Sequence, residues 1–241
     1  MAAIGVQHLV NADFVAVILP SFPAWAPWRP FWFYSCSLGL IAAGAAICAG
    51  WRTRSYATVL GSALLVLILL VDIPNQAATA MGSLGAWNNT LKALTLSGGA
   101  FAVAASPSPE ANPWDRPFVS FGCYAMALTV AIFGVEHFLY AAFVADLVPS
   151  WIPWHLFWTY FCGAALVAAG AGMALNVRAR LAANLLGSII FIWLLVLHIP
   201  RAVADPVSGH GNEWTSVCEA LSFSGICLVL GRRLPGAPGS R

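Results

Sequence analysis

The chain has 241 residues, of which 60% are hydrophobic and only 8% are charged, and its mean hydropathy is +0.81. Soluble domains carry about 25% charged residues, so this composition excludes an ordinary soluble enzyme. Eleven Lys and Arg against nine Asp and Glu leave a net charge of +2, which is too small for a nucleic-acid-binding surface. We therefore expect a polytopic membrane protein in a lipid bilayer, with no nucleic-acid partner.

Apolar segments with almost no charge follow one another along the chain, and a bilayer-spanning helix needs about 20 such residues. The opening segment, Met1–Leu19, lacks the basic start and the cleavage site of a signal peptide. Five long segments are predicted to span the membrane, and two shorter segments follow a Trp, which is typical of the membrane interface. In chain order these seven segments are Phe31–Gly50, Tyr56–Ile73, Thr90–Ala105, Phe118–Leu139, Phe157–Leu175, Ala182–Ile199 and Ser216–Gly231.

The sequence contains an internal repeat. Gly5-Val6-Gln7-His8 matches Gly134-Val135-Glu136-His137, Arg52 and Arg54 match Arg178 and Arg180, and Trp87 matches Trp214. The offset changes only between helices. We therefore expect an all-α fold of two tandem, parallel four-helix repeats, residues 1–105 and 118–231, joined by a linker (106–117) and followed by a tail (232–241). We expect the first helix of repeat one to be short, to begin upstream of Met1, or to be shifted so that it runs through His8 to about Leu19.

The arginines predict the orientation of this arrangement, because positive residues accumulate in cytoplasmic loops. The repeat model places eight of them on one face: Arg52, Arg54, Arg116, Arg178, Arg180, Arg232, Arg233 and Arg241. We therefore expect an integral plasma (inner) membrane protein whose linker and C-terminus are cytoplasmic.

The opposite face collects ionisable residues at helix ends, and five of them form a candidate site: His8, Asp72, His137, His155 and His198. Residues of this kind can relay protons or hold a quinone oxygen or a haem iron. A haem between His137 and His198 is the weaker interpretation, because the equivalents of these residues in repeat one are His8 and Asp72. Interfacial histidines with satisfied hydrogen bonds are the structural alternative. The six cysteines form no metal-binding spacing, so no metal site is expected.

Two charges lie well inside predicted spans. Lys92 follows Trp87 by five residues, and Glu219 follows Trp214 by five, so they occupy matched positions in the two fourth helices. An unpaired charge there costs a few kcal/mol. We expect the two to face each other as an intramembrane charge pair; the alternative is that each extends outward or pairs within its own repeat.

The chain resembles the DoxX-like family of four-helix membrane proteins. The resemblance rests on the Gly-Val-x-His that ends the first helix, the loop from Val148 to Pro153, a basic turn, and a Trp that opens the fourth helix. It implies a membrane subunit associated with a redox complex, with quinone as the small partner. Unlike thiol-exchange relatives, the chain has no CxxC motif. A non-catalytic scaffold subunit of a membrane complex and a carrier or receptor for a small ligand remain as alternatives, and enzymatic activity stays open.

The orientation is testable with reporter tags. A tag inserted between Ser106 and Pro117 and a tag placed after Arg241 should both report the cytoplasm, since four crossings separate the two sites. An external C-terminus would contradict the four-helix repeat.

Overall fold

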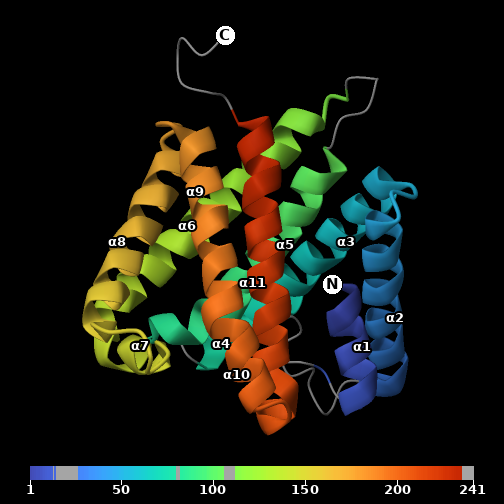
Figure 1. Cartoon of the computed structure of the whole chain (residues 1–241). Helices are drawn as coiled ribbons and strands as arrows, with labels where there is room; N and C mark the ends of the chain where they lie inside the picture. Colours follow the sequence, from blue (N-terminus) through green and yellow to red (C-terminus); the bar gives the residue numbers. More distant parts are fainter. Residues whose placement is uncertain (13, 15–26, 80–81, 106–111, 235–241) are drawn as a thin grey trace.

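The computed structural model describes residues 1–12, 14, 27–79, 82–105 and 112–234, and these residues form an all-α bundle (Figure 1). Two short π-helical segments, η1 and η3, and one 3₁₀ turn, η2, interrupt or precede the α-helices. The elements are α1 (Ala2–Asn11), α2 (Arg29–Cys48), α3 (Thr53–Leu67), η1 (Ile68–Asp72), α4 (Ile73–Thr79), η2 (Leu84–Trp87), α5 (Asn88–Ala104), α6 (Asp115–Leu139), α7 (Ala141–Leu147), α8 (His155–Ala174), α9 (Ala179–Trp193), η3 (Leu194–His198), α10 (Ile199–Ala204) and α11 (Ser208–Arg233).

Within the described residues, six helical segments are long and apolar enough to cross a bilayer. They are Arg29–Cys48, Thr53–Thr79, Asp115–Leu139, His155–Ala174, Ala179–Ala204 and Gly211–Arg233. Large apolar side chains such as Val59 and Leu70 remain exposed on them, as lipid-facing residues do. The chain is therefore an integral membrane protein. α5 has 17 residues and is mostly buried between other helices.

Three boundaries differ from those expected. α1 ends at Asn11, because Ala12 adopts a left-handed backbone conformation, so the first helix is short rather than shifted. α6 begins at Asp115, inside the expected linker, and α11 continues to Arg233, inside the expected tail. Residues 106–111 and 235–241 of the linker and tail, and the segment 15–19, lie outside the described residues.

Most of the helix ends that carry arginines lie at one end of the bundle (Figure 1), while Arg29 at the start of α2 and Arg201 in α10 lie at the other. The turn between α2 and α3, the turn between α8 and α9, the start of α6 and the end of α11 are all at the top of this view. The short helices α4, α7 and α10 lie at the opposite end. The bundle therefore has one arginine-rich end, and its other end is built from short helices.

Several local structures recur at an offset of 126 residues. α2 and α8 both have 20 residues, and each is preceded by a Trp, Trp28 or Trp154, with a left-handed backbone. α3 and α9 both have 15 residues, and each is preceded by a left-handed arginine, Arg52 or Arg178. Left-handed backbone is uncommon for residues other than glycine, so its recurrence at matched positions is specific.

The two π-helical segments also recur at this offset, and each has a proline two residues after its end. In η1 and η3 a backbone N–H bonds the carbonyl five residues back, from Ile73 to Ile68 and from Ile199 to Leu194. Pro74 and Pro200 have no N–H and their rings crowd the carbonyl four residues back, which favours a wider turn just before them. This wider turn changes the direction in which the side chains of Asp72 and His198, at its end, point away from the helix axis.

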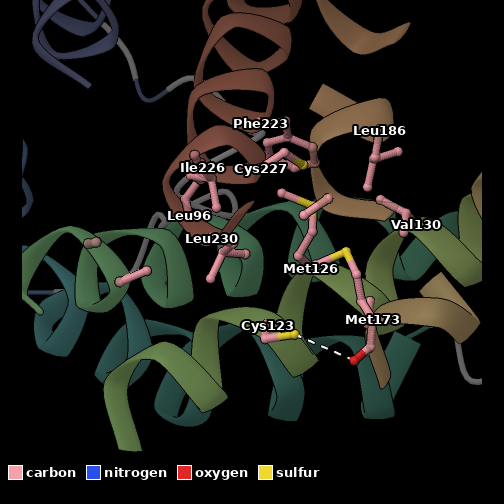
Figure 2. Close-up of a cluster of buried hydrophobic side chains, with 14 of the residues drawn as sticks. Leu96, Cys123, Met126, Val130, Met173, Leu186, Phe223, Ile226, Cys227 and Leu230 are labelled. Carbon is pink, nitrogen blue, oxygen red and sulfur yellow. Dashed lines mark hydrogen bonds between the residues drawn. The ribbon is translucent and has the colours of Figure 1, made fainter. Parts of the chain in front are cut away.

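The core lies where the central helices α5, α6 and α11 meet α9 (Figure 2). Small residues let α5 and α6 approach closely: a Cβ at Gly122 would lie 2.6 Å from the Gly98 carbonyl oxygen. Such contacts drive helix association in lipid, where no hydrophobic effect acts between helices. Met126, Cys227 and Leu230 fill the adjoining space and are almost fully buried.

Replacing Gly122 with Ala should destabilise the protein by about 1–3 kcal/mol, because the new methyl group would push two helix backbones apart. Thermal unfolding in detergent would measure the loss. Gly225→Ala is the matched control, since a Cβ at Gly225 meets no atom within 4 Å. Equal stability of the two variants would contradict the close α5–α6 contact.

Candidate functional site

A cavity of about 340 Å³ lies between the helices from α6 to α11, with one residue contributed by α5. Its wall is mostly apolar, and its polar groups come from five different helical segments, α5, α6, α8, η3 and α11. The lining residues are Lys92 of α5; Val130, Phe133 and His137 of α6; Val144 and Leu147 of α7; Val148; Trp158, Thr159, Cys162 and Leu166 of α8; Ile189, Ile190 and Trp193 of α9; Leu197 and His198 of η3; and Ser216, Glu219, Ala220 and Phe223 of α11.

The structure brings together four of the residues that the sequence singled out. Lys92, Glu219, His137 and His198 all line the cavity.

The other three candidates lie elsewhere. His8 of α1 is fully buried, with its ring edge-on to Phe14 at 5.9 Å. Asp72 is buried at the end of η1. His155 opens α8, and its carbonyl accepts a hydrogen bond from Thr159 Oγ1 at 3.0 Å. The predicted five-residue cluster is therefore divided: His137 and His198 line the cavity together with the charge pair, and the other three residues do not.

Lys92 and Glu219 meet at the cavity wall. Lys92 Nζ lies 3.1 Å from Glu219 Oε2, and the side chain of Glu219 is only 7% exposed. The second carboxylate oxygen, Oε1, is buried without a hydrogen-bond partner in the protein. A buried unpartnered oxygen beside a cavity is suited to accept a hydrogen bond from a ligand.

His137 has a defined ring orientation. Its Nδ1 lies 2.7 Å from the carbonyl oxygen of Phe133, so Nδ1 carries a proton and donates it there. In the neutral imidazole, Nε2 is then the acceptor. The helix backbone thus leaves one ring nitrogen of His137 available to the cavity.

The position of His198 follows from the π-helical turn that it ends. The next helix, α10, is tied to α11 by Arg201, which donates from Nε to Glu213 Oε2 at 3.0 Å and from Nη2 to Glu213 Oε1 at 2.7 Å. Beyond α10, hydrogen bonds from Ser208 lower the pKa of the exposed Asp205 carboxyl. These contacts support the end of the bundle at which His198 lies.

The aromatic part of the wall was not predicted. Phe133, Trp158, Trp193 and Phe223 come from four helices. All four lie within the apolar spans expected from the sequence, where nothing distinguishes them from other apolar residues. Their common cavity depends on how the helices pack, and spacing along the sequence carries no signal for it.

The arrangement joins a partly open, mostly apolar space to a few polar atoms, which is typical of a small-molecule site. The apolar walls can hold a ring or an alkyl group. Lys92 can donate a hydrogen bond, and Glu219 Oε1 and His137 Nε2 can accept one. Among the described residues, no group of three or more His, Cys, Asp or Glu side chains is placed to hold a metal ion.

The fold defines the chain as a helical integral membrane protein, and comparison with known proteins adds no more specific class. A family model described as a domain of unknown function, DUF8561, matches residues 126–221, which is less than half of the chain. This stretch includes every cavity-lining residue except Lys92 and Phe223. No curated protein matches the chain, and no solved structure matches it.

The charge pair is testable by reversal. Lys92→Glu and Glu219→Lys should each destabilise the protein by about 3 kcal/mol, because each leaves two like charges in a mostly buried site. The double reversal should recover much of that loss in thermal unfolding. If the double variant loses as much stability as the two single variants lose together, the two residues are not energetically coupled.

Proposed function

We propose that this membrane protein binds a quinone in the cavity and serves as an integral subunit of a redox-associated membrane complex. The observation that carries the proposal is the meeting of two histidines and the Lys92–Glu219 pair in one largely apolar cavity. Quinones need both features, since they combine an apolar ring with oxygens that form hydrogen bonds.

The residues present fit such a ligand. Trp158, Trp193 and Phe223 offer aromatic surfaces for the ring. Lys92 would donate to a carbonyl oxygen of the oxidised form. Glu219 Oε1 or His137 Nε2 would accept from a hydroxyl of the reduced form. Quinone itself supplies the electron-carrying chemistry when bound, and the chain's own groups orient it and hold protons at its oxygens.

The resemblance to DoxX-like proteins supports the redox association, because it implies a subunit that works with other membrane subunits. A carrier or receptor for another small apolar ligand would use the same cavity. Binding measurements with a quinone and with other apolar ligands would distinguish these two functions. A scaffold subunit would need no ligand there. Isolation in a stoichiometric complex without bound ligand would favour that alternative.

We also propose that the architecture is a tandem duplication of a four-helix unit around a pseudo-twofold axis. Matched caps, helix lengths and π-helical turns support it. So do equivalent hydrogen bonds from Ser97 Oγ to the Gly61 carbonyl at 2.7 Å and from Ser224 Oγ to the Gly187 carbonyl at 2.9 Å.

Two contacts between α5 and α11 support the axis itself. Lys92 meets Glu219, and a Cβ at Gly99 would clash with the side chain of Ile226. In both pairs the partners are separated by 127 residues, the offset between the two fourth helices. Residues that contact their own equivalents lie on a twofold axis.

We further propose that the arginine-rich end of the bundle faces the cytoplasm, in a plasma (inner) membrane. The clustering of most of the basic helix ends on one side supports this orientation. The cavity would then lie toward the outer face, where a quinone in the bilayer could reach it.

Quinone binding can be measured through tryptophan fluorescence, since Trp158 and Trp193 line the cavity. A short-chain quinone analogue should quench the emission of the purified protein saturably. His137→Ala and His198→Ala should each weaken binding about tenfold, which corresponds to one lost hydrogen bond. His155→Ala should leave it unchanged.

A pair of phenylalanine variants controls for the cavity. Ala220→Phe would place a ring inside it and should abolish saturable quenching. Leu221→Phe adds a ring at the neighbouring exposed position and should not. Quenching that is equal in both variants, or absent from the wild type, would contradict the proposal. A haem absorption band in the purified protein would assign the histidines to haem instead.

A further inference from the structure

A second cavity, of about 470 Å³, lies at the arginine-rich end of the bundle, away from the proposed quinone site. It is formed by the first turns of α6, the end of α8 and the end of α11. Arg116 and Arg233 line it together with Asp115, and Ser120 and Tyr124 add hydroxyl groups.

Among the described residues, carboxylates balance only part of the positive charge in this cavity. Asp115 pairs with Arg54, whose Nη2 lies 2.9 Å from Asp115 Oδ1, and Asp115 Oδ2 accepts from the backbone N–H of Asn112 at 3.3 Å. The Asp115 carboxylate therefore already has two partners outside the pair of cavity arginines. Within the described residues no carboxylate forms an ion pair with Arg116 or Arg233, and Arg233 Nη2 is buried without a hydrogen-bond partner.

The inner part of the cavity is apolar. Cys123 and Met173 are both buried and belong to the core, and the Cys123 thiol approaches the Met173 carbonyl oxygen at 3.7 Å (Figure 2). The cavity thus combines an apolar floor with two guanidinium groups. It lies at the ends of the candidate spans, at the level where a bilayer places its phosphates.

We propose that this cavity binds a phosphate-type anion through Arg233 and Arg116, and that the headgroup of an acidic phospholipid supplies it. Guanidinium groups present paired N–H donors that match phosphate oxygens. Basic pockets between membrane helices bind acidic headgroups in the same way. The apolar floor favours a lipid over a free anion, because a lipid brings apolar groups next to its phosphate. This site does not depend on the proposed quinone binding.

The test compares the thermal unfolding of delipidated protein after addition of phosphatidylglycerol, phosphatidylcholine or inorganic phosphate. Phosphatidylglycerol should raise the unfolding midpoint by about 5 °C, as a ligand bound well above its dissociation constant does. Phosphatidylcholine should raise it much less, since its choline cation faces two arginines. An equal shift with inorganic phosphate would support the anion site but would overturn the lipid, because a free anion would then be its ligand.

Arg233→Gln should remove the difference between the two lipids, and Arg116→Gln should reduce it. Arg232→Gln is the matched control: Arg232 is the preceding residue of α11, is exposed and does not line the cavity. A lipid difference that persists in Arg233→Gln, or that disappears equally in Arg232→Gln, would overturn the proposal. So would equal stabilisation by the two lipids. Native mass spectrometry of wild type and Arg233→Gln would report retained phosphatidylglycerol even if the variant is less stable.

Discussion

The contact between Lys92 and Glu219 is the interaction on which the centre of this protein depends. In an apolar bundle each charge alone would cost several kcal/mol, so the two must remain together for α5 and α11 to stay in place. The contact also keeps polar atoms at the wall of the adjoining cavity. The group that stabilises the two helices is therefore also the group that can recognise a ligand.

Around this contact the helices associate through small residues and hydroxyl-to-carbonyl hydrogen bonds. Gly98 and Gly122 allow α5 and α6 to touch, and Gly99 admits Ile226 two turns from the ion pair. Thr95 Oγ1 donates to Thr129 Oγ1 at 2.8 Å, and Thr129 Oγ1 donates to the Leu91 carbonyl at 3.0 Å. In lipid these contacts supply the specificity that hydrophobic burial supplies in water.

Much of the helical architecture could be predicted from the sequence, because apolar length decides which segments cross a bilayer. The expected span Phe31–Gly50 corresponds to Arg29–Cys48, and Phe157–Leu175 corresponds to His155–Ala174. The predicted spans ended at Ile73 and Ile199, and the helical continuation past Pro74 to Thr79 and past Pro200 to Ala204 was not predicted, since a proline ordinarily indicates a helix end and here follows a wider turn. Lys92 and Glu219 each follow a tryptophan by five residues, and this matched position was enough to predict that they face each other. The cavity beside them could not be predicted, because it depends on the packing of side chains from separate helices.

The proposed duplication also accounts for why the first cavity lies mostly in the second half of the chain. By the repeat offsets, the equivalents of His137 and Thr159 are His8 and Phe33. The ring of Phe14 lies edge-on to both His8, at 5.9 Å, and Phe33, at 5.3 Å, so aromatic rings occupy the space beside the first histidine. The small Thr159 leaves space beside His137 instead. Two copies of one backbone plan can thus diverge through side-chain size alone, with one half packed and the other open to a ligand.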